Sequence, residues 1–269
     1  MTAVASANRL PMSTVLAQSR ALGRRSVLAT FRQPTVWFPG VFFPLLIAAV
    51  NSAAMGRTTN LAGFPEVDSF LQFLLPATLV QAVLFGGIIA GSDMALDVED
   101  GFFDRLASSP VSRLSILMGR LSSSAALGVV QAVVIIGVFF VFGARVAGGI
   151  PAVLALILLA VVLAVAVGGA AAAIGLRTGS QEAVQNSFPL VFILLFASSA
   201  FFPTQLMSGW YQTLAENNPL TWMIDASRAL VISEFSMSDV VMMLGVASAF
   251  AALSIWIAVR QLYRRLRLG

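Results

Sequence analysis

Residues 151–175 read PAVLALILLAVVLAVAVGGAAAAIG, an almost unbroken run of alanine, valine and leucine. A helix needs about 20 apolar residues to cross the hydrocarbon core of a bilayer, and this run is long enough. Backbone amides in lipid must find their hydrogen bonds within the chain, which favours a helix. The run therefore predicts an all-α integral membrane protein.

Five more apolar stretches of comparable length flank this run on both sides. They lie at about 35–55, 71–92, 115–142, 186–202 and 239–260. Together the stretches predict six transmembrane helices. No stretch of the chain has the composition of a soluble domain, so we expect one membrane domain over residues 1–269.

The composition supports a membrane protein and excludes several kinds of chemistry. The chain is 58% hydrophobic and 10% charged, with a mean hydropathy of +0.91, whereas a soluble domain carries about 25% charged residues. Cysteine and histidine are absent, which excludes disulfides, thiol nucleophiles, imidazole bases and the usual zinc sites. Lysine is absent too, so no phosphate-binding loop of the form G-x-x-x-x-G-K-[ST] exists. We therefore expect neither an enzyme nor a metal or cofactor site in this chain.

The arginines predict the orientation in the membrane. With both termini cytosolic, the inside segments hold 13 arginines and the outside segments hold three. This asymmetry follows the positive-inside rule and predicts a multi-pass protein of the cytoplasmic membrane. It also explains the net charge of +4 without a nucleic-acid partner. The N-terminus lacks a compact apolar region with a cleavage site, so we expect no removable signal peptide.

Residues 1–34 contain five arginines and no acidic residue. On a helical wheel an apolar arc runs beside the arginines and comprises Met12, Val15, Leu16, Leu22 and Val27. One interpretation is an amphipathic helix at the cytosolic interface. The other is a simple positively charged flank of the first span, and the sequence leaves both open.

The stretch Asp93–Arg120 reads DMALDVEDGFFDRLASSPVSRLSILMGR and is the charged cytosolic segment between two spans. Four carboxylates share one helical face, at Asp93, Asp97, Asp100 and Asp104. A solvated or arginine-facing surface is favoured over a cation site, because like charges at this spacing repel. Gly101 and the Ser-Ser-Pro sequence ending at Pro110 predict a helix–turn–helix elbow. Exposed phenylalanines at 102 and 103 would then suit a docking surface.

Residues 203–237 are too polar to span the membrane and too apolar for an ordinary loop. Pro203 ends the preceding span, and Asn217-Asn218-Pro219 is a turn signal. We expect a helical hairpin that enters the membrane part-way from outside, before the last span. The alternative is an interfacial loop anchored by Trp210, Tyr211 and Trp222.

These two segments resemble the type 2 ABC exporter permeases. The cytosolic part of the resemblance lies in Glu99-Asp100-Gly101, Asp104-Arg105-Leu106, Ser109-Pro110-Val111-Ser112-Arg113 and Gly119-Arg120. The extracellular part lies in Phe202-Pro203, Trp210, Asn218-Pro219-Leu220-Thr221, Asp225 and Arg228. The order and spacing are most similar to the daunorubicin and doxorubicin resistance subgroup of drug and lipid exporters. The chain departs from the family at Asp97 and Val98, where a basic residue is common.

The resemblance implies a permease subunit that works with a separate ATPase, which would bind ATP and Mg²⁺. A second permease, identical or homologous, would complete the transporter. The ATPase-coupling residues would be Glu99, Asp100, Gly101, Phe102, Phe103, Asp104, Arg105, Leu106, Pro110 and Arg113. The hairpin residues would be Pro203, Trp210, Asn218, Pro219 and Arg228.

The cargo is expected to be hydrophobic or amphipathic, because the spans lack paired acids and bases, and the resemblance implies a drug or a lipid. Candidate residues of its path are Gln81, Phe85, Asn186, Phe192, Phe196 and Phe201. Two other classes stay open at this point. A secondary transporter or channel would need an ionisable group within the membrane, and a lipid-modifying enzyme would need a catalytic cluster there.

Overall fold

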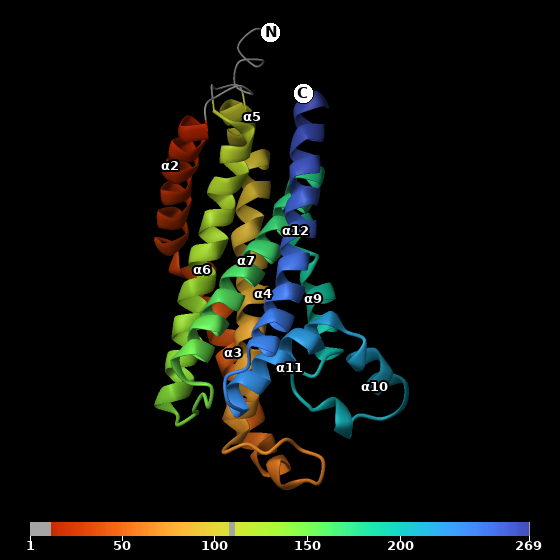
Figure 1. Cartoon of the computed structure of the whole chain (residues 1–269). Coiled ribbons are helices and arrows are strands. Elements are labelled where there is room, and N and C mark those ends of the chain that lie inside the picture. Colours follow the sequence, from red (N-terminus) through yellow and green to blue (C-terminus); the bar gives the residue numbers. More distant parts are fainter. Residues whose placement is uncertain (1–11, 108–110, 269) are drawn as a thin grey trace.

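The computed structural model describes residues 12–107 and 111–268, and within these ranges the chain forms helices and no strands (Figure 1). The helices are α2 (Met12–Phe31), α3 (Pro34–Met55), α4 (Phe70–Glu99), α5 (Phe102–Ala107), α6 (Arg113–Val141), α7 (Gly149–Thr178), α8 (Gln181–Gln185), α9 (Phe188–Phe196), α10 (Gly209–Glu216), α11 (Pro219–Ile232) and α12 (Met237–Leu268). Two short 3-10 helices, η2 (Gly56–Asn60) and η3 (Thr204–Leu206), lie in the connections.

Local signals explain where several helices begin and end. Ser69 caps α4 by accepting a hydrogen bond from the Gln72 amide, and Ser180 caps α8 in the same way. Asn218 caps α11 through the Leu220 amide, with Pro219 at the first helical position. Gly179 ends α7 in the left-handed conformation, with φ of +66°.

Within the described residues, five helices are long and apolar enough to cross a membrane. They are Trp37–Asn60, Phe70–Glu99, Leu114–Val141, Gly149–Thr178 and Met237–Leu266, and they correspond to five of the six predicted spans. The stretch predicted as the fifth span, about 186–202, does not form one long helix. Its α9 has nine residues, about 13 Å at 1.5 Å per residue, which is under half of the hydrocarbon thickness.

Helix α4 is the centre of the bundle. Of the residues in its most apolar stretch, 94% are buried, compared with 22% in the first and last long helices. Helices α3, α6, α7 and α11 surround it. Small residues permit the closest approach: a Cβ on Gly175 of α7 would lie 2.9 Å from the Ala95 side chain of α4. Such contacts between small residues are the usual basis of helix packing in membranes.

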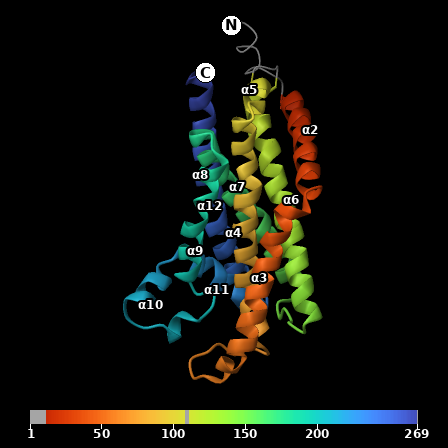
Figure 2. The ribbon, with the colours of Figure 1, turned by 180° about the vertical axis from the view of Figure 1, so that it is seen from behind.

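The two ends of the bundle carry different elements. Helix α5, helix α2 and the C-terminal end of α12 lie together at one end, while η2 and α10 lie at the other (Figures 1 and 2). This arrangement agrees with placing residues 93–120 and the C-terminal arginines on the same side of a membrane.

Helix α2 packs lengthwise on α6, and both views show the two side by side (Figures 1 and 2). Its buried positions are Gly23, Ser26 and Thr30, whereas Leu16 of the predicted apolar arc is 63% exposed. Apart from Leu22, which packs against the core, the predicted arc is therefore not the face turned to α6, and its interfacial role stays a prediction. The two helices approach most closely at Gly119 of α6, where an added Cβ would lie 2.7 Å from the Leu22 side chain of α2.

Candidate functional site

The junction of α4 and α5 is built around Gly101. Helix α4 ends at Glu99, Asp100 caps it, and Gly101 follows with φ of +65°. A left-handed backbone is disfavoured for residues with a Cβ, so glycine permits the sharp turn into α5. Helix α5 is six residues long and α6 begins at Arg113. Residues 108–110, including the predicted elbow residue Pro110, lie outside the described part.

The two phenylalanines of α5 differ in environment. Phe103 is 1% exposed and packs in a cluster with Met94, Leu117 and Leu262. Phe102 is only partly buried. The expectation of two exposed phenylalanines is therefore wrong for Phe103, whose ring packs among side chains of α4, α6 and α12. Phe103 thus anchors the short helix to the core.

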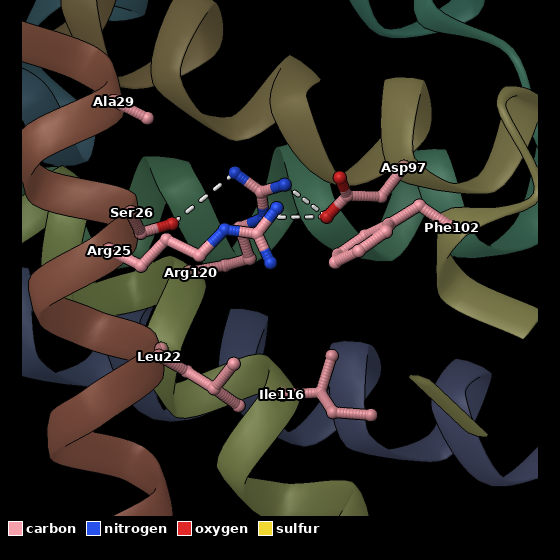
Figure 3. Close-up of a pocket in the computed structure, with 9 residues that line it drawn as sticks. Leu22, Arg25, Ser26, Ala29, Asp97, Phe102, Ile116 and Arg120 are labelled. Carbon is pink, nitrogen blue, oxygen red and sulfur yellow. Dashed lines mark hydrogen bonds and ion pairs between the residues drawn. The ribbon is translucent and has the colours of Figure 1, made fainter. Parts of the chain in front are cut away.

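Arg120 of α6 is the polar centre of this end of the bundle. Its Nε donates to Asp97 at 2.8 Å, a second nitrogen also pairs with Asp97, and Nη1 lies 3.5 Å from Asp93. Nη1 also donates to Ser26 Oγ at 3.3 Å (Figure 3). The interpretation of an arginine-facing acidic surface is confirmed for Asp93 and Asp97. Arg120 therefore ties α4 and α2 to α6.

Helix α2 makes further contacts with the start of α6. The Ser112 amide donates to Gln18 Oε1 at 2.9 Å, and Ser115 Oγ donates to the Val15 carbonyl at 3.0 Å. The Arg25 guanidinium lies 4.5 Å from the centre of the Phe102 ring. Helix α2 is therefore joined to both arms of the elbow.

A recess of about 80 Å³ lies where these helices meet (Figure 3). Its lining comprises Leu22, Arg25, Ser26, Ala29, Asp97, Phe102, Ile116, Gly119 and Arg120. The sequence prediction missed the contribution of α2 and of Arg120. The Gly119-Arg120 pair in the sequence could have signalled this site. Glycine lets a neighbouring helix approach closely, and the adjacent arginine is long enough to donate hydrogen bonds to that helix.

The remaining coupling candidates have different surroundings. Glu99 accepts a hydrogen bond from the Gln181 amide at 2.7 Å and so joins α4 to α8. Asp100 is exposed, and so is Arg105, which lies 5.9 Å from the centre of the Phe102 ring. The side chains of Asp104, Leu106 and Arg113 lie outside the described part. Among the described candidates, Phe102, Phe103 and Arg105 come together on α5.

The predicted cargo-path residues lie in three places. Gln81 and Phe85 are each 2% exposed inside the bundle, and the Gln81 amide nitrogen has no hydrogen-bond partner in the described part. Asn186 is exposed at the end of α8. Phe196 and Phe201 instead line a cleft of about 810 Å³ between α3 and the segment from α9 to α10.

Aromatic rings connect Phe85 inside the bundle to the cleft. Phe85 stacks on Phe192 at 5.1 Å, Phe192 on Phe196 at 5.3 Å, and Phe196 lies 4.9 Å from Phe201. The cleft itself also has Leu46, Asn51, Met207 and Tyr211 in its lining. Four of the six predicted residues therefore form one row of rings that leads from α4 to the cleft. Gln81 and Asn186 are not among the residues that line the cleft.

The segment between α9 and α12 is held by two buried polar side chains. Asn218 donates to the carbonyls of Leu194 and Ala197. Arg228, 5% exposed, donates to the carbonyls of Phe73 and Ser199 and pairs with Asp225 at 2.6 Å. The bonds to Leu194, Ala197 and Ser199 satisfy carbonyls at and just after the end of α9, and the bond to Phe73 connects this segment to α4.

The other predicted hairpin residues take simpler roles. Pro203 precedes η3, Pro219 begins α11, and Trp210 is 78% exposed on α10. The segment thus forms two helices, α10 and α11, joined at Asn217 and Asn218.

Comparison with known proteins identifies the family. The model of the ABC-2 type transporter family matches residues 17–232. The chain is 28% identical over 241 residues to the daunorubicin resistance ABC transporter permease protein DrrB1 of Streptomyces coeruleorubidus, covering 89% of this chain and 83% of that protein. It is 26% identical over 243 residues to a probable doxorubicin resistance ABC transporter permease protein, DrrC, of Mycobacterium tuberculosis, covering 88% and 86%. The matched region includes the α4–α5–α6 junction, the row of phenylalanines and α11, and the chain therefore belongs to the ABC-2 type transporter permease family.

Proposed function

We propose that this chain is the membrane subunit of an ATP-driven exporter of the cytoplasmic membrane, with both termini cytosolic. A separate ATPase subunit would bind ATP and Mg²⁺ and dock on the end that carries α5. The observation that carries this proposal is the anchoring of α5: this short surface helix packs on α4 and α6 through Phe103 and contacts α2 through Arg25, while Arg120 ties α2, α4 and α6 to one another.

Such anchoring would allow α5 to transmit a movement to the helices of the bundle. ATP can shift the transporter between two states only if its binding energy differs between them. A movement imposed on α5 would be passed to α4, which is the most buried helix of the bundle. The core resists continuous deformation because it is close-packed, so the helices would move as units.

The proposed cargo is a hydrophobic or amphipathic drug or lipid. The cleft of about 810 Å³ has a largely apolar and aromatic lining, with Asn51 and Tyr211 among its few polar groups. This is the usual character of a small-molecule site. We propose that a second permease, identical or homologous, closes the open side of the cleft, where α3 exposes Phe42, Leu46 and Val50.

We also propose that α9 to α11 form a hairpin that enters the membrane from outside, so that α9 completes a sixth, interrupted crossing. Irregular backbone at membrane depth is tolerated where protein satisfies it. Asn218 and Arg228 supply that satisfaction to the carbonyls of Leu194, Ala197 and Ser199.

The alternative is a secondary transporter or channel without an ATPase partner. It would use buried Arg228 and its half-exposed partner Asp225 as a coupling site. The guanidinium, however, is engaged by Asp225 and by the carbonyls of Phe73 and Ser199. This favours a structural role for Arg228.

The test is affinity purification of the chain from its native membrane, with identification and quantification of the co-purifying proteins. A soluble ATPase in about equal amount is expected. The variant Asp104→Ala with Arg105→Ala should reduce the co-purified ATPase at unchanged permease yield. A matched control removes one acid and one arginine at the opposite end, with Arg57→Ala and Glu66→Ala. Equal ATPase recovery with both double variants would argue against docking on α5.

A further inference from the structure

Helix α2 carries arginines that form no ion pair with a carboxylate in the described part of the chain. Its arginines at 20, 24 and 25, and Arg32 directly after it, are all exposed, and α2 contains no acidic residue. Within the described residues the ion pairs involve Arg120 and Arg228, so none neutralises an arginine of α2. A negatively charged partner would complete this surface.

The depth of these arginines in the membrane indicates which kind of negatively charged partner can reach them. Helix α6 ends at Val141, and about 20 residues before that end, near residue 121, the helix leaves the hydrocarbon core. Helix α4 starts at Phe70, and the same count reaches its boundary at about residue 90. The two counts place Arg120 about 2 Å and its bonded partner Asp97 about 11 Å outside this boundary at 1.5 Å per residue, a mean of about 6 Å. The headgroup layer on one side is about 5 to 8 Å thick.

Arg25 shares this depth because it lines the same recess as Arg120 and Asp97 (Figure 3). The arginine count places this end of the bundle in the cytosolic leaflet. The recess lies at the base of α5, at the depth that phospholipid headgroups already occupy, whereas the ATPase would dock on the exposed part of α5 that carries Arg105. The charge on α2 therefore fits a lipid better than an acidic protein surface.

Arg25 is the arginine of α2 that is best prepared to hold a phosphate. Its guanidinium rests against the Phe102 ring at 4.5 Å, which limits its orientations, and no carboxylate lies within ion-pair distance of it in the described part. Arg120, by contrast, is already engaged by Asp97 and Asp93. A planar guanidinium can donate two parallel hydrogen bonds to one phosphate group.

We propose that the recess between α2, α5 and α6 binds the headgroup phosphate of an anionic phospholipid from the cytosolic leaflet, with Arg25 as the main donor. The volume of about 80 Å³ suits part of a headgroup and is too small for a whole cargo molecule. The lipid would contact the residue that rests on Phe102, and so it would stabilise the position of α5. This site depends on the membrane placement of the chain and not on the ATPase or the cargo.

The test is native mass spectrometry of the purified full-length chain in mild detergent with equal amounts of phosphatidylglycerol and phosphatidylcholine. The wild-type chain is expected to retain phosphatidylglycerol preferentially. Arg25→Gln should reduce that preference about fivefold, the factor for one arginine at an anionic surface. Arg25→Lys, which keeps the charge, should retain most of the preference.

The matched control is Arg177→Gln. Arg177 is exposed at the same end of the bundle, two residues after Gly175, which packs on Ala95 of α4. It has the same charge at a similar depth but does not line the recess. The proposal predicts an unchanged preference in this variant.

Three results would overturn the proposal. One is a wild-type preference in Arg25→Gln, and another is an equal loss in Arg177→Gln, which would indicate unspecific charge attraction. The third is release of phosphatidylglycerol by millimolar inorganic phosphate, which would indicate a site for a soluble anion. An ATPase that fails to co-purify would leave all three results unaffected, so the two proposals fail separately.

Discussion

Individual polar residues hold this chain together at the places where its helices are interrupted. Arg228 is the clearest case, because one buried guanidinium bonds to Asp225 and to the carbonyls of Phe73 and Ser199. It also lies 3.8 Å from the centre of the Phe73 ring. The break after α9 is thereby fastened to α4 and α11.

Replacing Arg228 by methionine is expected to destabilise the protein strongly. It removes the side-chain donor of the Phe73 and Ser199 carbonyls and the ion-pair partner of Asp225, and each lost hydrogen bond to a charged group costs about 1.5 to 3 kcal/mol. The measurement is the unfolding transition in detergent, followed by circular dichroism. The control is Arg145→Met, an exposed arginine at the same end of the bundle, which should leave the transition unchanged. Equal transitions for the two variants would contradict the structural role.

Residue identity alone did not reveal which side chains are buried. Phe102 and Phe103 are adjacent and chemically identical, yet Phe103 is packed in the core while Phe102 rests under Arg25. Gln81 is polar and was expected beside the cargo path, but α4 is surrounded by other helices and buries it. In both cases burial depends on which helix lies opposite, and that information is not local.

At the scale of elements, the central feature is the connection from α4 through α5 to α6. The turn depends on Gly101 with φ of +65°, and nothing lies within 4 Å of a Cβ built there. A substitution would therefore act through the backbone conformation alone. This isolates the geometry of the turn from its packing.

Gly101→Ala is expected to destabilise the turn by about 1 to 2 kcal/mol, the cost of a left-handed alanine. In membranes that contain the complete transporter, the variant should lower the amount of cargo moved per ATP hydrolysed while the chain still inserts. A matched control is Gly137→Ala in α6, which also has no atom within 4 Å of the added Cβ but an ordinary backbone. An unchanged ratio in Gly101→Ala would show that the turn geometry does not limit coupling.

The elements differ in how well their boundaries follow from sequence. The predicted span at about 115–142 corresponds closely to α6, because a continuous apolar run leaves little choice. The predicted span at about 186–202 is equally apolar but forms only α9 and a turn. There the side chain of Asn218, more than 20 residues later, binds the carbonyls that would otherwise continue the helix.

The whole molecule has two chemically distinct ends, and the absence of cysteine makes them easy to test. Trp210, 78% exposed on α10, and Leu220, 6% exposed on α11, lie on the side predicted to be outside. Arg264 is exposed near the end of α12, on the side predicted to be cytosolic.

Single cysteines at these three positions should react differently with a membrane-impermeant thiol reagent added to intact cells. Trp210→Cys should label rapidly, Leu220→Cys slowly, and Arg264→Cys only after the membrane is permeabilised. The readout is the rate of labelling detected on a gel. Labelling of Arg264→Cys in intact cells would invert the orientation, and rapid labelling of Leu220→Cys would indicate a surface loop in place of a buried helix.

The amino-acid sequence by itself determined the class of this protein, because hydropathy, arginine asymmetry and turn signals act locally along the chain. Long apolar runs must become helices in lipid, and Gly101 and Pro219 mark turns wherever they occur. Only the tertiary structure decided which of these features meet. It placed α2 on α6, joined Arg120 to Asp97 and Ser26, and buried Phe103. In place of a sixth continuous span it formed the short helix α9, whose end is bonded by Asn218 and Arg228. Those outcomes depend on contacts between residues far apart in sequence, for which close packing of complementary shapes is the physical cause.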